Sequence, residues 1–259
     1  LEEYGEILSL CERYNFVCNK LVDIRGTVFD TDEEIIKKCE LCRDHKIELV
    51  MALGWGEHDC DISQQMALKA MQSGKIRGMD TLVYTLAEMI RAMELGCRSF
   101  LMYDEGLLYA CINMRRDGKI PPETTFKLSA LLSIANPLAV KFWFDKAGLD
   151  SRDSVNPVRD LTLPMIAAIR EVTDRPLDIH IFWQTSIART FEAPEIVRVG
   201  APVNLKNSRS GANITLEERF LQSLRCVQMI EKCYPEAKQS PNGSEGQSIP
   251  AKPGAWSLK

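Results

Sequence analysis

The sequence predicts an α/β protein, a single-domain (β/α)8 barrel of the TIM type. Short apolar runs typical of strands alternate with amphipathic helical patterns, most often with one helix between two strands, which favours parallel pairing. About eight such strand runs occur in 259 residues, a usual length for one barrel. No glycine-rich phosphate fingerprint follows an early strand, which weakens the alternative of an open dinucleotide-binding sheet.

The expected elements follow from these patterns and from residues that begin or end helices. Thr31 and Thr215 each stand before acidic first turns and are expected helix N-caps. Pro137 suits a first helical turn, and Gly96 suits the position after a helix. The predicted strands are 17–24, 47–54, 75–80, 98–104, 125–133, 154–157, 176–183 and 202–208. The predicted helices are 2–13, 31–46, 63–74, 81–96, a segment ending at 116, 136–148, 161–173 and 215–234.

Composition excludes some classes of partner and limits the domain. The net charge of −4 gives no electrostatic argument for binding nucleic acid or an anionic membrane, and no apolar run is long enough to cross a bilayer. Nine scattered cysteines, with Cys39 and Cys42 inside a helical pattern, favour the reducing cytoplasm over a disulfide framework. The barrel is expected over 1–235. Residues 236–259, rich in Pro, Gly and Ser, are expected to form an extended tail that could hold a homo-oligomer through Trp256.

The alternation of side chains along each strand assigns the barrel interior. In 176–183, Leu177, Ile179 and Ile181 suit the apolar helix layer, so Asp178 and His180 are expected to point inward. Leu128 likewise faces the helices. The same rule turns inward Arg77, Lys127, Ser129, Ser154, Asn156, Asn204 and Lys206.

This polar interior has two interpretations. Buried charges are costly unless they are paired, so the cations need acids such as Asp178 beside them, with Lys127 as a candidate partner. The first interpretation is a structural ion-pair network that fills the barrel. The second is an active site whose floor is this network, since barrel chemistry takes place at the carboxyl ends of the strands. In that case His180 lies nearer the mouth than Asp178 and exchanges protons near neutral pH.

Polar residues also follow several predicted strands. Asp80 and Asp160 are expected helix N-caps, and Asp104 with Glu105 either satisfy a helix start or contribute to the site. Residues 55–59 and Arg159 stand at strand ends as well. His58 and His180, with Asp80 or Glu105, could bind a divalent metal, although no ligand spacing supports one. No four-cysteine iron–sulfur motif is present, so the cofactor is left unknown.

Four stretches of the sequence together resemble a known family. They are "RGMDTLVYTLAEMIRAMELGCRSFLMYDEGLL", "KLSALLSIANPLAVKFW", "SVNPVRDLTLPMIAAIREVTDRPLDIHIFW" and "EAPEIVRVGAPVNLK". They are similar to the U32 peptidase-like (collagenase-like) family, in its poorly characterised bacterial branch, over roughly residues 45–240. The resemblance implies a TIM-type barrel, a cytoplasmic location and a hydrolase or protease label. Neither G-x-S-x-G nor H-E-x-x-H occurs.

Three functions follow for the barrel mouth. The first is a U32-like hydrolase acting on a peptide or small polar substrate. Its catalytic candidates are His180, Asp178, Lys127 and Glu105, and its substrate-binding candidates are Arg77, Asp104, Ser129, Asn156 and Lys206. The second is a lyase or aldolase-like barrel in which Lys127 or Lys206 forms a Schiff base and residues 207–211 bind a phosphate. The third is a non-catalytic binding or assembly subunit.

Overall fold

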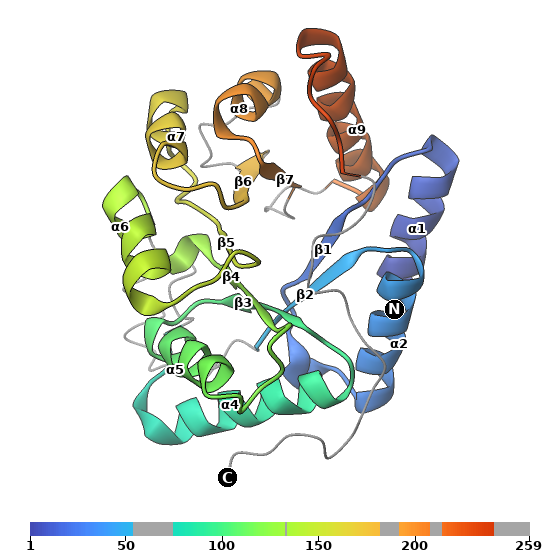
Figure 1. Ribbon diagram of the computed structural model, residues 1–259. Helices are drawn as coiled ribbons and strands as arrows, with labels where there is room; N and C mark the ends of the chain where they lie inside the picture. The colour runs from blue at the N-terminus through green and yellow to red at the C-terminus, as the bar shows by residue number, and fades with distance from the viewer. Residues whose placement is uncertain (54–74, 133, 182–191, 208–213, 241–259) are drawn as a thin grey trace. The chain divides into compact units, whose positions relative to one another are not determined.

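The computed structural model describes residues 1–53, 75–132, 134–181, 192–207 and 214–240. These residues divide into two compact units. Unit 1 comprises Leu1 and Cys18–Leu132, and unit 2 comprises Glu2–Val17 and residues 134–240. Parallel strands alternate with helices along the chain in both units (Figure 1), so the predicted TIM-type (β/α) class is confirmed. The division into a barrel over 1–235 and a tail stays a prediction, and the tail from residue 241 on, with Trp256, lies outside the described residues.

Unit 1 contains four parallel strands paired in chain order. Val22 on the first strand pairs with Val50, Val50 pairs with Ser99, and Ser99 pairs with Thr125. The strands are β1 (Lys20–Asp23), β2 (Glu48–Ala52), β3 (Ser99–Met102) and β4 (Thr125–Leu128). The helices are α2 (Asp32–Asp44), α4 (Gly78–Glu94) and α5 (Glu105–Arg116), with short 3-10 turns η1 (Thr27–Phe29) and η2 (Ala130–Leu132).

Local chemistry accounts for the ends of these helices. Thr31 caps α2 in a capping box with Glu34, as predicted, because each satisfies a backbone N–H of the other. Gly96 follows the end of α4 with φ 112°, a left-handed conformation that glycine adopts without strain. Cys39 and Cys42 are buried within α2, where they pack as small apolar side chains.

Unit 1 buries apolar side chains on both sides of its strands. Val50, Ala52, Leu101 and Tyr103 form a cluster on the side of Lys127, and a second set lies on the helix-facing side. Its members are among the most completely buried side chains of the chain: Leu49, Met51, Phe100, Met102, Phe126 and Leu128. Lys127 alternates with Phe126 and Leu128, so it points to the opposite side of β4, as the alternation rule predicts.

Unit 2 contains three parallel strands and five helices among the described residues. Val155 pairs with Leu177, Asp178 with Asn204, and His180 with Lys206. The strands are β5 (Ser154–Val155), β6 (Leu177–Ile181) and β7 (Val203–Asn207). The helices are α1 (Glu2–Tyr14), α6 (Pro137–Lys141) with its π-helical continuation η3 (Phe142–Ala147), α7 (Leu163–Arg170), α8 (Ala193–Gly200) and α9 (Leu216–Cys233).

The first and last helices of unit 2 lie side by side (Figure 1). The Arg13 guanidinium on α1 is 2.9 Å from Glu217 Oε1 on α9, and the Tyr14 hydroxyl donates to the same oxygen at 2.8 Å. The ring of Phe220 contacts Tyr14 in a tilted arrangement and Phe16 edge to face, with centroid distances of 5.7 and 4.8 Å. Contacts between residues more than two hundred positions apart therefore join the two ends of this unit.

The face assignment on β6 agrees with the structure. A Cβ atom added at Gly200 of α8 would meet Ile166 of α7 at 3.0 Å and Ile179 at 3.9 Å, which places Ile179 on the helix side. Leu177 and Ile181 share that side and are buried. Asp178 and His180 therefore point to the other side of the strand.

The predicted strand at 75–80 is wrong. Residues 75–77 have no regular structure, and α4 begins at Gly78, whose φ of 74° is incompatible with an extended strand. Arg77 is the N-cap residue of α4 and not an inward-facing strand residue, and Asp80 lies in the first turn instead of capping it. The cap of α7 is Thr162, not Asp160.

The structure describes seven strands where eight were predicted, and the one that is not found is the predicted strand at 75–80. The predicted helix at 63–74, residues 55–59 with His58, and most of the phosphate-binding candidate 207–211 lie outside the described residues. In the part of the chain that is described, no helix is both long and apolar enough to cross a membrane.

Candidate functional site

The candidate site lies on the side of β5–β7 opposite to the helices. Strand register places Asp178 beside Asn204 and His180 beside Lys206. Ser154 and Asn156 come from β5 and the residue that follows it. In open or closed parallel sheets, ligands bind at the carboxyl ends of strands, and His180 and Lys206 stand near those ends. The structure thus brings together four of the predicted residues: Asn156, Asp178, His180 and Lys206.

Asp178 is a buried carboxylate held by three hydrogen bonds. Its Oδ2 accepts from Ser154 Oγ at 2.8 Å and from Asn156 Nδ2 at 3.4 Å, and its Oδ1 accepts from Asn204 Nδ2 at 2.6 Å. The residue is only 3% exposed. These three hydrogen bonds fix the position of the Asp178 carboxyl group below His180.

Asn156 connects this carboxylate to the neighbouring cation. Its amide nitrogen donates to Asp178, while its amide oxygen accepts from Lys206 Nζ at 3.4 Å. An amide turned the other way would lose both bonds, so its two partners determine its orientation. Asn156 thereby holds Lys206 on the same face as His180.

His180 is a half-buried imidazole whose pKa is strongly lowered. Burial is the main cause, the nearby charges of Lys206 and Arg159 lower it further, and Asp178 opposes them; together they bring the pKa of His180 to about 3. This pKa lies well below the neutral range in which the sequence predicts proton exchange at His180. The imidazole is neutral at pH 7 and carries a nitrogen that can accept a proton.

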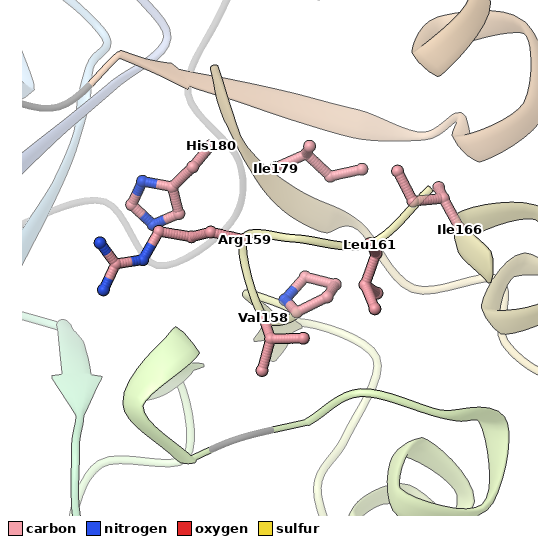
Figure 2. Close-up of a pocket in the computed structure, with 7 residues that line it drawn as sticks. Val158, Arg159, Leu161, Ile166, Ile179 and His180 are labelled. Atoms are coloured by element: carbon pink, nitrogen blue, oxygen red, sulfur yellow. The ribbon is translucent and has the colours of Figure 1, made fainter. Parts of the chain in front are cut away.

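A shallow pocket opens beside His180. His180 and Arg159 lie together on one side of it (Figure 2). Leu161, Ile166 and Ile179 lie on the other side (Figure 2). The pocket therefore combines a polar, cationic wall with an apolar one.

Arg159 was not among the predicted binding residues. Burial lowers the pKa of its guanidinium. It stands four residues after Val155, the end of β5. Its position after a strand was the signal in the sequence that could have identified it.

The predicted residue Lys127 belongs to a different cluster, in unit 1. Its Nζ lies 2.8 Å from Glu48 Oε1, and both side chains are almost fully buried, at 2% and 0% exposed. Ser99 Oγ donates to the same oxygen at 2.9 Å, and Lys20 Nζ lies 3.4 Å from the other. Sequence reasoning named Asp178 as the candidate acid for Lys127 and missed Glu48, although a glutamate inside the apolar run 47–54 was a visible signal.

The other predicted residues of unit 1 have local structural partners. Asp104 caps α5 by accepting from Leu107 N at 2.9 Å, and its second oxygen accepts from Ile76 N at 3.1 Å. Glu105 forms an ion pair with Lys75. Ser129 Oγ accepts from Leu131 N at 3.2 Å in the turn after β4. Asp104 and Glu105 therefore hold the segment that leads into α4.

Among the described residues, there is no group of three or more His, Cys, Asp or Glu side chains that could hold a metal ion. The predicted metal candidate His58 lies outside these ranges.

The shifted histidine gives a testable pH dependence of stability. The pKa of His180 is lower in the folded protein than the unfolded value of 6.5, so the unfolded chain binds more protons between pH 6.5 and pH 3. This contribution to stability is complete above pH 6.5 and is lost as the pH falls, by about 1.4 kcal/mol per pH unit. Urea unfolding at pH 7 and pH 4.5 should show that wild type loses roughly 2–3 kcal/mol more than His180→Gln. Equal losses in both proteins would contradict the assigned pKa.

No protein-family model and no curated protein sequence matches this chain. Among solved structures, a U32 peptidase shares 12% identity with a TM-score of 0.41, over 95% of this chain and 81% of that one. The YdjI aldolase from Escherichia coli K12 shares 11% identity with a TM-score of 0.40, over 93% of this chain and 96% of that one. Similarity at this level does not distinguish a hydrolase from a lyase.

Proposed function

We propose that this chain is a hydrolase of the U32 peptidase-like type, acting on a peptide or small polar substrate at the carboxyl ends of β5–β7. The observation that carries the proposal is the neutral imidazole of His180 in a pocket at these strand ends, next to the fixed carboxylate of Asp178. A neutral imidazole is the form that a general base requires.

The proposed chemistry is general-base hydrolysis. His180 takes a proton from a water molecule while the water oxygen attacks the substrate carbonyl carbon. The imidazolium then returns the proton to the leaving nitrogen as the C–N bond breaks, so that one water is consumed and an acid and an amine are released. Asp178 stabilises the transient imidazolium by its negative charge, and Asn156 and Asn204 hold that carboxylate in place.

A hydrolysis screen tests this proposal. Wild-type protein is incubated at pH 7.5 with a panel of short peptides and N-acyl amino acids, and amine release is followed by mass spectrometry. We expect His180→Gln to lower the rate on any hydrolysed compound by about 100-fold or more, the usual contribution of a general base. His45→Gln, an exposed histidine at the end of α2, is the matched control and should keep full activity. Full activity of folded His180→Gln, or no hydrolysis by wild type across the panel, would contradict the proposal.

A Schiff-base lyase is a second candidate because Lys206 lies on the same face as His180, across the register from it. Lys127 is less suited to this role, since Glu48 occupies its buried amine. Borohydride reduction with small aldehydes and ketones should then add mass at Lys206 and not at Lys127. The Lys206→Met variant should give no adduct. Absence of any Lys206 adduct across a broad carbonyl panel would remove this candidate.

A further inference from the structure

The outer side of α4 is apolar, unlike that of α2 in the same unit. The exposed residues of α2 all carry a charge: Asp32, Glu33, Lys37, Glu40 and Asp44. The exposed residues of α4 include a single charge: Gly78, Met79, Asp80, Val83, Tyr84 and Ala87. Met79 is 69% exposed and Tyr84 is 73% exposed, so neither belongs to the core. A helix that is apolar on its outer side as well as on its inner side is usually covered by another segment.

Four of these residues form one stripe, which we call the α4 face: Met79, Val83, Tyr84 and Ala87. Met79, Val83 and Ala87 follow one another at intervals of four residues, and Tyr84 precedes Ala87 by three. These spacings place side chains on one side of a helix. The other side carries the buried side chains of Thr85, Met89, Ala92 and Met93. The α4 face is thus separate from the side of the helix that packs into unit 1.

Residues 249–259, with the sequence IPAKPGAWSLK, have the chemistry to cover the α4 face. The segment contains the large apolar residues Ile249, Trp256 and Leu258, which are too few to form a core of their own. Its charges are those of two lysines with no acid, which suits a helix side whose exposed charge is Asp80. Two prolines restrict the unbound chain, so less conformational entropy is lost on docking. The segment lies outside the described residues.

The chain is long enough to bring this segment to the α4 face. Gln239 Nε2 donates to Val17 O at 3.0 Å, which ties the start of the tail to residue 17. From Val17 the chain reaches Thr27 in ten residues, at most about 36 Å, and Arg91 of α4 donates to Thr27 O. Trp256 is 17 residues beyond Gln239, a span of up to about 60 Å. The excess of about 24 Å covers the Arg91 side chain and the roughly 10 Å, two helical turns, back along α4 to the middle of the α4 face.

We infer that residues 249–259 dock on the α4 face of their own chain, with the indole of Trp256 against Val83 and Tyr84. The competing occupant is a second copy of the chain. A tethered segment has an effective concentration on the order of mM, whereas a second copy competes at the concentration of the protein itself. Contact between the indole and the tyrosine ring adds to the burial of apolar area. The tail therefore covers α4 within one chain and does not join two chains.

Site-specific photo-cross-linking on the full chain tests this placement. The photoreactive variant is Tyr84→p-benzoylphenylalanine, and the irradiated protein is separated by denaturing electrophoresis and digested for mass spectrometry. We expect the main cross-link to join position 84 to a residue of 249–259 within a band of monomer mass. The matched control is Tyr109→p-benzoylphenylalanine, at a tyrosine on α5 that is 57% exposed, and it should give no cross-link to that segment.

Substitutions on both partners follow the same contact in solution. Trp256→Phe identifies the emission of Trp256 among the four tryptophans of the chain, by difference from wild type. That emission should be blue-shifted relative to free tryptophan, because the docked indole is out of water. Val83→Asp should move it to the wavelength of an exposed indole and reduce the cross-link yield from position 84 to that of the Tyr109 control. Thermal melts verify that Val83→Asp is folded, and Ala87→Asp on the same stripe is the second variant.

Three results would overturn the inference. The first is that position 84 gives no cross-link to residues 249–259, or cross-links instead to another part of the chain such as residues 54–74. The second is a main cross-linked band of dimer mass, which would assign the α4 face to a second copy. The third is the emission of an exposed indole from Trp256 in the wild type. None of these results bears on hydrolysis at His180, which belongs to unit 2, so this inference and the proposed function fail separately.

Discussion

Replacing Asp178 with alanine is expected to lower the free energy of unfolding by about 3–5 kcal/mol, close to the effect of breaking a buried charge interaction. The substitution removes the acceptor for Ser154, Asn156 and Asn204 at once. Buried donors left without an acceptor cost about 1–3 kcal/mol each. It also removes the negative charge that opposes the two cations beside His180. Urea unfolding at pH 7, with the slope checked against wild type, measures the loss.

Asp178→Asn is the matched control for this prediction. Its amide keeps one acceptor oxygen but turns the second acceptor into a donor, next to side chains that already donate. We expect Asp178→Asn to lower the free energy of unfolding by more than a surface substitution does and by less than Asp178→Ala does. If Asp178→Ala and Asp178→Asn each lower the free energy of unfolding by less than about 1 kcal/mol, the hydrogen bonds to Asp178 contribute little to the stability of the fold.

Replacing Glu48 with alanine should destabilise unit 1 by a similar amount, about 3–5 kcal/mol. Glu48 is fully buried and lies against two ammonium groups, those of Lys127 and Lys20. Without the carboxylate, the Lys127 amine loses its ion-pair partner in a position that is 2% exposed, and the Ser99 hydroxyl loses one acceptor. The destabilisation follows more from the stranded charge than from the lost attraction.

A double variant distinguishes these two causes. Glu48→Gln combined with Lys127→Met removes both members of the pair and keeps similar side-chain volumes. Buried ion pairs replaced in this way are often no less stable than the original, so we expect the double variant to recover most of the stability lost in Glu48→Ala. Lys20 stays in place in this variant, so if the double variant is as unstable as Glu48→Ala, the charge of Lys127 is not the cause.

Hydrophobic periodicity predicted most of the fold because it reports burial directly. The alternation around Phe126 and Leu128, and around Ile179, assigned strand faces that the structure confirms. The capping residues Thr31 and Thr215 were recognisable because side-chain chemistry determines a helix start locally. Strand and helix positions, which depend on local pattern, were therefore largely accessible from the sequence.

The segment 75–80 shows where local pattern fails. Its two apolar residues, Ile76 and Met79, do not distinguish a short strand from the approach to a helix. Positive φ at Gly78 and the hydrogen bond from Ile76 N to Asp104 decide between them, and that bond joins residues 28 positions apart. Such a contact exists only in the folded chain.

The site was predicted in part for the same reason. Asp178, His180 and Lys206 could be assigned to one face by counting along strands, but Glu48 as the partner of Lys127 depends on which strands are neighbours. The pKa of His180 could not be predicted at all, because it depends on burial and on charges from two other segments. Pairing and electrostatics are properties of the assembled sheet.

The contact between the first and last helices of unit 2 has a consequence for protein synthesis. Arg13 and its partner Glu217 are 204 residues apart, so a ribosome that adds about 5–20 residues per second delivers the partner roughly 10–40 s after Arg13. Throughout this interval Tyr14 and Phe16 have no Phe220 ring to pack against. The rings of Tyr14 and Phe16 therefore stay uncovered by α9 until synthesis has passed residue 220.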